Sequence, residues 1–317
     1  MTAKEPTAGW TRRGVLGLAG AVLGTGLLSA LSGCASPAIR SLEMACGEPG
    51  GTYIRFGQLL ASSVERAGIA ARMRVRETEG SVQNLELLRT GAVRLAISLA
   101  DAVPDPPAGL AAIGRVYQNY LQCIVPEGRT GLTELRGHAV SIGAAGSGTA
   151  LSARRVLDAL DLLGDGGVEP REMRLSDAVQ ALGEGSIGAL FWSGGVPLPA
   201  LSALGEGAPI APIDLTAALD LLRERYPRVY HPTAIPAGVY GLRESLPSIG
   251  VPNLLLVRED EQDHLAAALV DRLIDDASRL VPDPSVGVQF LTPSNLIDTA
   301  SVPLHPAARR RYRERHG

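Results

Sequence analysis

Short apolar runs alternate with helical stretches along the first half of the chain beyond residue 41. Leu42–Cys46 and Leu95–Leu99 are typical of buried strands, and Ala71–Arg76 alternates apolar and polar residues as a strand does. Between them lie an amphipathic segment that Gly68 ends and a second helical segment, Val82–Arg89. The order strand–helix–strand–helix–strand predicts a parallel sheet with helices on its faces.

The second half of the chain follows the same order. His138–Gly143 and Ile187–Trp192 have the pattern of strands, and Ser176–Leu182 has that of a short helix. An amphipathic helix is predicted over Thr149–Leu163, with Gly164 as its stop. The matching order indicates two similar α/β lobes, although the sequence identity between the halves is too low to define a repeat.

Two further apolar strands, Tyr120–Val125 and Val251–Arg258, are expected to pass from one lobe to the other. Proline-rich residues 102–112 indicate a surface loop, and a helix at roughly Asp263–Leu280 would return to the first lobe. The sequence therefore predicts the α/β class, with two lobes, two hinge strands and a ligand cleft where the strand ends face each other. The predicted lobes comprise residues 41–122 with 253–317, and residues 126–250.

Residues 1–33 have the layout of a bacterial export signal. Two adjacent arginines precede a glycine-rich apolar run, as in twin-arginine signals, and the run ends in Leu31-Ser32-Gly33-Cys34, which resembles a lipoprotein cleavage site. We expect cleavage before Cys34, a lipid on its thiol, a tether over residues 34–40, and an extracytoplasmic protein anchored to the cell membrane. The alternative is an uncleaved anchor, because the run approaches the length that spans a bilayer.

Composition fits a globular protein that does not bind nucleic acid. The 317 residues favour two domains, and 45% are apolar while 20% are charged. The net charge is −3, and removal of Lys4, Arg12, Arg13 and Glu5 with the signal gives −3 − 3 + 1 = −5. No basic field therefore points to nucleic acid.

Cysteines and histidines do not indicate a metal site. The cysteines are Cys34, Cys46 and Cys123, too few for a four-cysteine zinc site, and the five histidines lack paired metal-ligand spacing. Outside the cytoplasm Cys46 and Cys123 could form a disulfide, or each could be a separately buried thiol. The spacing leaves both alternatives open.

Three polar loops lie at the ends of predicted strands, and each leads directly into a predicted helix. Gly146-Ser147-Gly148-Thr149, Thr78-x-Gly80-Ser81-x-x-Asn84 and Gly50-Gly51-Thr52-Tyr53 carry glycines and hydroxyl groups but few charges. The free N–H groups of such a helix start attract anions. Simple N-capping explains any one loop, but three loops on two lobes favour a shared ligand site.

Catalytic patterns are weak. The sequence around Ser147 lacks the glycines two residues before and two residues after the serine that a nucleophile elbow uses. Lys4 is the sole lysine, so no phosphate-loop Gly-Lys pair exists. A secreted hydrolase using Ser147 or Ser81 is the enzymatic alternative.

The loop motifs, taken together and in order, closely resemble the TAXI family of solute-binding proteins of TRAP transporters. The resemblance covers about residues 40–290, and the chain departs from it at Arg55 and in the shortened stretch 102–112. It implies a periplasmic-binding-protein type II fold, no catalysis and no cofactor. The motifs are Gly50-Gly51-Thr52-Tyr53, Thr78-x-Gly80-Ser81-Val82-x-Asn84-Leu85, Leu88-x-x-Gly91 with Asp101, Gly143-x-x-Gly146-Ser147-Gly148-Thr149, Phe191-Trp192-x-x-Gly195-Val196-Pro197, Ile235-Pro236-Ala237-Gly238-Val239-Tyr240 and Val251-Pro252-Asn253-Leu254-Leu255.

Site residues are predicted from the loops and from this resemblance. The first lobe would contribute hydroxyl and amide groups, and the second lobe would contribute the start of a helix. Two further residues would form an apolar wall, and Asp101 would lie nearby at a strand end. The predicted ligand-binding residues are Tyr53, Ser81 and Asn84 from the first lobe, Ser147, Gly148 and Thr149 from the second, Trp192 and Pro197 in the wall, and Asp101.

Donor-rich loops without lysine or histidine favour a small carboxylate, and the resemblance points to an amino acid such as glutamate or to a dicarboxylate. Asp101 could pair with a ligand amino group or serve only as a cap, while Arg55 and Arg76 could bind a distal carboxylate or lie at the surface. The resemblance implies delivery to the membrane subunits of a TRAP-type permease. A ligand-sensing protein that reports to a signalling partner is the other binding alternative.

Overall fold

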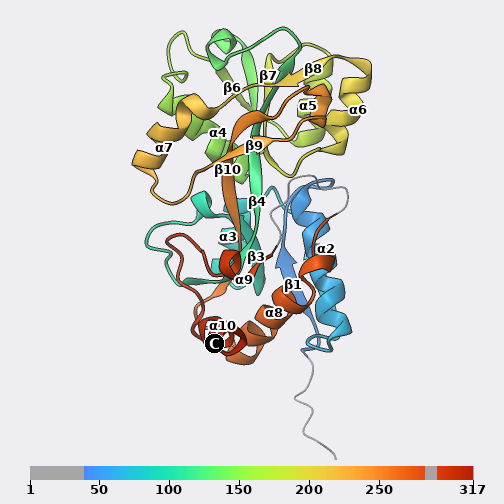
Figure 1. Ribbon diagram of the computed structural model, residues 1–317, viewed down its shortest axis with the longest axis vertical. Helices are drawn as coiled ribbons and strands as arrows, with labels where there is room; N and C mark the ends of the chain where they lie inside the picture. Colours follow the sequence, from blue (N-terminus) through green and yellow to red (C-terminus); the bar gives the residue numbers. More distant parts are fainter. Residues whose placement is uncertain (1–38, 283–290, 317) are drawn as a thin grey trace, which may run out of the picture. The chain divides into compact units, whose positions relative to one another are not determined.

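A computed structural model describes residues 39–282 and 291–316 (Figure 1). The predicted signal peptide and the lipidation residue Cys34 lie outside the described residues. Within the described chain, the strands form one ten-stranded sheet that runs through two α/β lobes. Its main strand order is β2-β1-β3-β10-β4-β7-β5-β6, with β8 pairing with β4 and β9 with β10.

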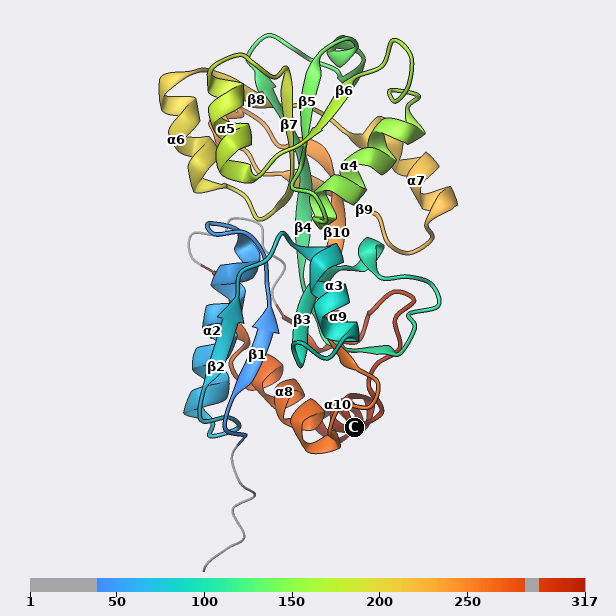
Figure 2. The ribbon, with the colours of Figure 1, turned by 180° about the vertical axis from the view of Figure 1, so that it is seen from behind.

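The first lobe is built on three short parallel strands, seen side by side in Figure 2. β1 (Leu42–Ala45) lies between β2 (Met73–Arg76) and β3 (Leu95–Leu99) and pairs with both in parallel. Connecting helices α2 (Thr52–Arg66) and α3 (Ser81–Arg89) pack on the sheet. This is the predicted order, and it places the starts of both helices at the carboxyl ends of strands.

The second lobe repeats that arrangement. β5 (Ala139–Gly143) lies between β6 (Glu169–Glu172) and β7 (Ala189–Gly194), again in parallel, and α4 (Gly148–Ala159) and α5 (Leu175–Gly183) connect them. The remaining described elements of this lobe are α6 (Pro199–Gly207), β8 (Ile210–Pro212), α7 (Leu219–Arg225) and β9 (His231–Ile235).

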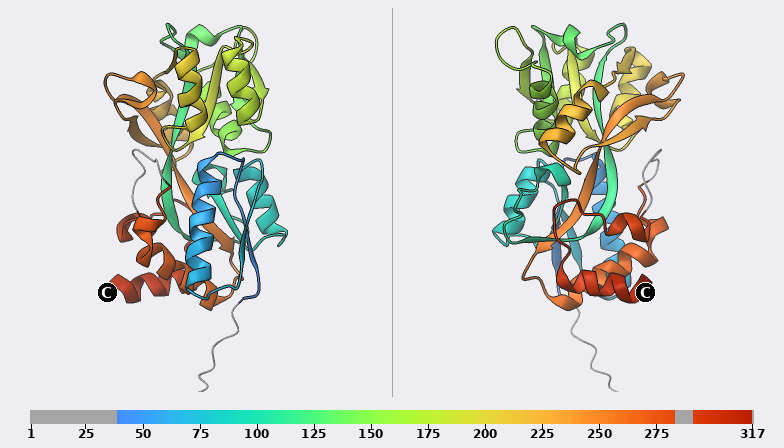
Figure 3. Two further views of the ribbon diagram at one scale, coloured as in Figure 1. Left: turned by 90° about the vertical axis from the view of Figure 1, so that its right-hand side faces the viewer. Right: turned by 60° about the vertical axis from the view of Figure 1, so that its left-hand side comes forward.

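Two long antiparallel strands join the lobes. β4 (Leu110–Pro126) and β10 (Leu246–Arg258) pair from Leu121 opposite Ile249 to Leu110 opposite Arg258. Figure 3 shows both strands running from one lobe into the other. In the first lobe β10 pairs antiparallel with β3, and in the second β4 pairs antiparallel with β7. The predicted fold class, α/β and periplasmic-binding-protein type II-like with two hinge strands, is confirmed, while the predicted residue limits of the lobes stay a prediction.

Each lobe has its own apolar core. Phe56, Leu60 and Val64 repeat along one face of α2 and are fully buried against the first sheet, as amphipathic spacing requires. In the second lobe, Val156 and Leu157 of α4 are fully buried in the same way.

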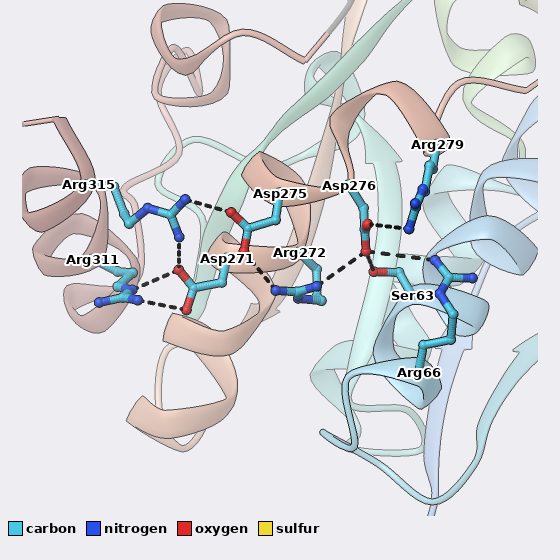
Figure 4. Close-up of polar contacts among 9 residues, drawn as sticks. All are labelled: Ser63, Arg66, Asp271, Arg272, Asp275, Asp276, Arg279, Arg311 and Arg315. Carbon is cyan, nitrogen blue, oxygen red and sulfur yellow. Dashed lines mark hydrogen bonds and ion pairs between the residues drawn. The ribbon is translucent and has the colours of Figure 1, made fainter.

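The C-terminal helices close the outer face of the first lobe. α8 (Asp263–Asp275) packs against α10 (Pro306–His316), and short α9 (Pro293–Leu296) precedes α10. Figure 4 shows the charged contacts. Arg311 and Arg315 of α10 pair with Asp271 of α8 at 2.8 and 2.9 Å, and Ser63 of α2 donates to Asp276 at 2.5 Å. The basic tail is therefore held by complementary acidic groups on α8.

Several sequence expectations need correction. The stretch 102–112 is not entirely a surface loop, because β4 begins at Leu110 and Leu110, Ala111 and Ala112 are buried in the sheet. The helix predicted over Thr149–Leu163 ends at Ala159, where Asp161 takes a left-handed φ of 53° before Gly164 is reached.

Cys46 and Cys123 are two separate buried thiols. Burial raises the pKa of Cys46 to about 12 and also raises that of Cys123, because the thiolate form is poorly solvated in the core. Both thiols therefore remain protonated and unreactive at neutral pH.

Among the described residues, we find no helix that is both long enough and apolar enough to span a bilayer.

Close packing of α2 on β1 predicts the effect of enlarging Gly57. A Cβ at this position would lie 2.6 Å from the sulfur of Cys46, so Gly57→Ala should lower the free energy of unfolding by about 1–3 kcal/mol. The matched control is Gly205→Ala in α6, where the nearest contact would be an ordinary 3.5 Å and better helix propensity should stabilise by up to about 1 kcal/mol. Urea denaturation of both variants measures the difference, and equal effects would contradict the packing described for α2.

Candidate functional site

A cavity lies between the lobes and is lined by loops that follow the parallel strands of each lobe. The space between its walls is about 410 Å³, counting the part open to solvent. Loops from both lobes line it, and six of the predicted residues are among them: Tyr53, Ser81, Ser147, Gly148, Thr149 and Trp192.

The cavity wall contributed by the second lobe is the first turn of α4. Ser147 caps this helix, since its Oγ accepts the N–H of Ala150 at 3.0 Å. The amides of Gly148 and Thr149 belong to the first turn, where the helix itself supplies no acceptor. Thr149 Oγ1 accepts the N–H of Ser193 at 3.2 Å, which ties the helix start to the end of β7. This wall can therefore present N–H and hydroxyl donors to an anion.

At the corresponding start of α3, the first backbone N–H groups already have a hydrogen-bond acceptor. The N–H groups of Val82 and Gln83 donate to the carbonyl of Gly146 in the second lobe, at 3.1 and 3.2 Å. Ser81 Oγ accepts the N–H of Leu99 at 3.0 Å. Of the three predicted anion seats, the one at α4 is thus a better candidate than the one at α3, because a backbone carbonyl already occupies the start of α3.

A chain of buried polar side chains crosses the floor of the cavity. The hydroxyl of Tyr53 donates to Asn253 Oδ1 at 2.7 Å, and Asn253 Nδ2 donates to Asn119 Oδ1 at 2.8 Å. Asn119 Nδ2 then donates to the carbonyl of Ser193 at 3.0 Å. Asn119 lies on β4 and Asn253 on β10, so the chain links the two lobes through the strands that join them. Burial raises the pKa of Tyr53, which keeps its hydroxyl a donor.

No metal centre accompanies this cavity in the described part of the chain, where we find no group of three or more His, Cys, Asp or Glu side chains arranged to hold an ion.

Comparison with known proteins then identifies the family. The model of the NMT1-like family matches residues 44–315, which is most of the chain. The protein belongs to the NMT1-like family.

Solved structures resemble the fold of this NMT1-like protein at low sequence identity. A protein of Bordetella bronchiseptica RB50 is 14% identical with a TM-score of 0.52, covering 87% of this chain and 98% of that chain. The GluR0 ligand-binding core from Nostoc punctiforme, in complex with L-glutamate, is 15% identical with a TM-score of 0.47, covering 75% and 95%. The periplasmic aliphatic sulphonate binding protein SsuA from Escherichia coli is 15% identical with a TM-score of 0.46, covering 87% and 79%.

Asn84 does not line the cavity of this NMT1-like protein. Its side chain is fully buried within the first lobe, where Nδ2 donates to the carbonyl of Ile97 at 2.8 Å and to that of Cys46. Its Oδ1 accepts the hydroxyl of Thr78 at 2.6 Å. These contacts use the amide inside the lobe, where it fixes α3 against β1 and β3.

Asp101 lies outside the cavity lining as well. It is 4% exposed, and its Oδ2 accepts hydroxyl groups of Ser152 at 2.6 Å and Tyr230 at 2.8 Å. Arg155 approaches the same oxygen at 3.7 Å. Burial raises the pKa of Asp101, opposed by these hydrogen bonds and by the arginine. Its partners come from the second lobe, so Asp101 contributes to contact between the lobes.

Pro197 lines a neighbouring, smaller cavity of about 270 Å³ together with Arg55. Thr52 lines both cavities, and its Oγ1 accepts the N–H of Gly195 at 3.0 Å. Arg55 is thus placed near the cleft, whereas Arg76 lies 3.8 Å from Glu43 on the outer strands.

Sequence reasoning missed the polar floor and the acidic residues of the cavity. Asn119, Glu48 and Glu79 line it, and Asn253 supports it from β10. One signal in the sequence indicated the polar floor: Asn253 lies among apolar residues of a predicted hinge strand, where a buried side-chain amide requires a hydrogen-bond partner.

The polar floor predicts different outcomes for half-buried Tyr53 and buried Tyr117. Tyr53→Phe removes the donor to Asn253 Oδ1 and should lower the free energy of unfolding by about 1–3 kcal/mol. The hydroxyl of Tyr117, in contrast, is buried without a hydrogen-bond partner in the described structure, so Tyr117→Phe should leave stability unchanged or raise it. Equilibrium urea unfolding measures both, and a larger loss for Tyr117→Phe would contradict the described network.

Proposed function

We propose that this protein is an extracytoplasmic solute-binding protein that closes its two lobes around a small carboxylate and delivers it to a TRAP-type permease. The observation that carries the proposal is the cavity between the lobes, where the first turn of α4 presents donors opposite hydroxyl groups of the first lobe. The NMT1-like family and the type II-like fold support the same reading.

In the proposed binding mode, the solute carboxylate sits at the α4 start. It would accept the amide N–H groups of Gly148 and Thr149 together with a hydroxyl of the first lobe, Tyr53 or Ser81. Trp192 would cover the apolar part of the solute. Several hydrogen bonds and the helix dipole would then compensate the desolvation of the carboxylate.

Closure is proposed to be the functional motion. In the structure the lobes already touch, since a Cβ placed on Gly148 would lie 2.5 Å from Ser81 Oγ and 2.6 Å from a methyl group of Leu99. Such contact requires glycine at the α4 start. Opening about β4 and β10 would admit the solute, and closing would enclose it.

Binding is favoured over hydrolysis at this site. Ser81 and Ser147 both line the cavity, but none of the described lining residues is a histidine. Ser147 Oγ is engaged as the cap of α4 and Ser81 Oγ as an acceptor for Leu99. These are the contacts of structural hydroxyl groups and not of an activated nucleophile.

The membrane partner and the anchor are proposed from the sequence. The lipobox-like residues before Cys34 support a lipid on that thiol, and the TAXI-like motifs support a TRAP-type permease as the recipient. A sensing role would use the same cavity. Uptake of the bound solute, measured in cells with and without the protein, separates the two roles, because only a transport role requires the protein for uptake.

Two substitutions in the cavity test the proposed function. A thermal-shift screen of amino acids and organic acids should identify a solute that raises the melting temperature. For that solute, Thr149→Val and Ser81→Ala should each weaken binding by about 1–3 kcal/mol, because each removes a hydroxyl group from the site. Titration calorimetry measures the affinities.

The matched control is Ser62→Ala, since Ser62 is an exposed serine of α2 whose hydroxyl donates to the carbonyl of Gln58. Its affinity should equal that of the unaltered protein. Unchanged affinity in both Thr149→Val and Ser81→Ala would exclude this cavity as the binding site.

A further inference from the structure

The charged side chains of the cavity are all acidic in the described structure. Glu48 and Glu79 line it, while no arginine, lysine or histidine does so within the described residues. A solute with two carboxylates would therefore find helix and hydroxyl donors for one of them and no cationic side chain for the other. The lining points instead to a positive charge on the solute.

Glu48 is the carboxylate whose burial calls for a counter-ion. It is 9% exposed, and its Oε2 accepts the N–H of Leu175 at 2.9 Å. Burial raises its pKa, although that hydrogen bond and the positive charge of Arg174 oppose the rise. A carboxylate can accept about four hydrogen bonds, so one backbone N–H leaves most of its capacity unused.

Glu79 differs from Glu48 in already having a cation. It forms an ion pair with Arg174, whose side chain is 57% exposed and outside the cavity lining. Arg174 is thus engaged by Glu79, and the more deeply buried Glu48 lines the cavity without a direct ion pair in the described structure.

The surroundings of Glu48 suit a cation. Trp192 lines the same cavity, and a Cβ on Gly51 would lie 3.7 Å from the indole ring and 3.1 Å from the carbonyl oxygen of Glu48. The ring and the Glu48 loop are therefore neighbours across Gly51. An ammonium group near a tryptophan face gains a cation–π interaction in addition to its ion pair.

We propose that Glu48 is the counter-ion of a positively charged group on the solute, which is therefore a zwitterion with a single carboxylate. The inference rests on the proposed function and narrows its solute class. The carboxylate of a zwitterion would lie at the α4 start, and its ammonium group would reach Glu48 from the other side of the cavity. A dicarboxylate without an amine is excluded by the same argument.

A purely structural role for Glu48 makes a different prediction. Its bond to Leu175 joins the first lobe to the start of α5 in the second, so it could serve only to hold the lobes together. Glu48→Gln separates the two roles, because the amide oxygen still accepts the Leu175 N–H while the charge is lost. Glu77→Gln is the matched control: it removes an exposed carboxylate from the loop that precedes α3, outside the cavity lining.

The experiment measures affinity for pairs of solutes that differ only in the amino group. L-leucine with 4-methylpentanoate and L-glutamate with glutarate are two such pairs, and 3-methylbutylamine tests the amine alone. With the full-length protein, we expect the amine-bearing member of a bound pair to bind at least about tenfold more tightly, and leucine-like neutral zwitterions to bind more tightly than glutamate. Glu48→Gln should abolish this preference, while Glu77→Gln should keep it.

Two results would overturn the inference while leaving the proposed function intact. One is tighter or equal binding of the des-amino acids to the unaltered protein, a result that does not depend on how any variant folds. The other is an unchanged preference in a Glu48→Gln protein whose melting temperature matches that of Glu77→Gln. If none of these solutes binds, and no other amino acid or organic acid does, the proposed function fails and this inference fails with it.

Discussion

The antiparallel pairing of β4 with β10 is the constraint on which the rest of the structure depends. Each strand is long enough to run through both lobes, and each extends the parallel strands of one lobe by pairing antiparallel with β3 or β7. The two lobes therefore share a backbone ladder instead of a flexible linker. Because the parallel strands of both lobes end near this ladder, the loops that open α2, α3 and α4 converge above it.

Contact between the lobes depends on small residues and on backbone groups. Gly148 allows α4 to approach Ser81, and the Gly146 carbonyl satisfies the first N–H groups of α3. Asp101 adds a buried charged contact to Ser152 and its neighbours. The lobes thus meet through hydrogen-bonding groups that would otherwise be hydrated. This is consistent with a cleft in which contacts between the lobes replace contacts with water when the cleft closes.

The sequence allowed prediction of the two lobes and of the helix starts, because apolar periodicity and Gly/Ser/Thr loops mark them locally. It could not show which polar side chains remain available. Asn84 and Asp101 have suitable chemistry, but Asn84 donates to a backbone carbonyl of its own lobe and Asp101 Oδ2 accepts a hydroxyl group of the second lobe. Neither side chain lines the cavity. Asn119 and Asn253 are separated by more than a hundred residues, and only the strand register brings their amides together. The start of β4 at Leu110 could not be predicted for the same reason, because the residue it pairs with, Arg258, is remote in sequence.

The central claim is that the lobes close around a solute, and Trp192 reports this directly. It lines the cavity, is 7% exposed, and becomes the sole tryptophan when Trp10 is replaced by phenylalanine. Acrylamide quenching of its fluorescence therefore measures access to the cleft. If the lobes close around the solute, quenching should be strong in the solute-free protein and should decrease markedly at a saturating concentration of a solute that raises the melting temperature. Quenching that stays the same when that solute is bound would contradict closure around it.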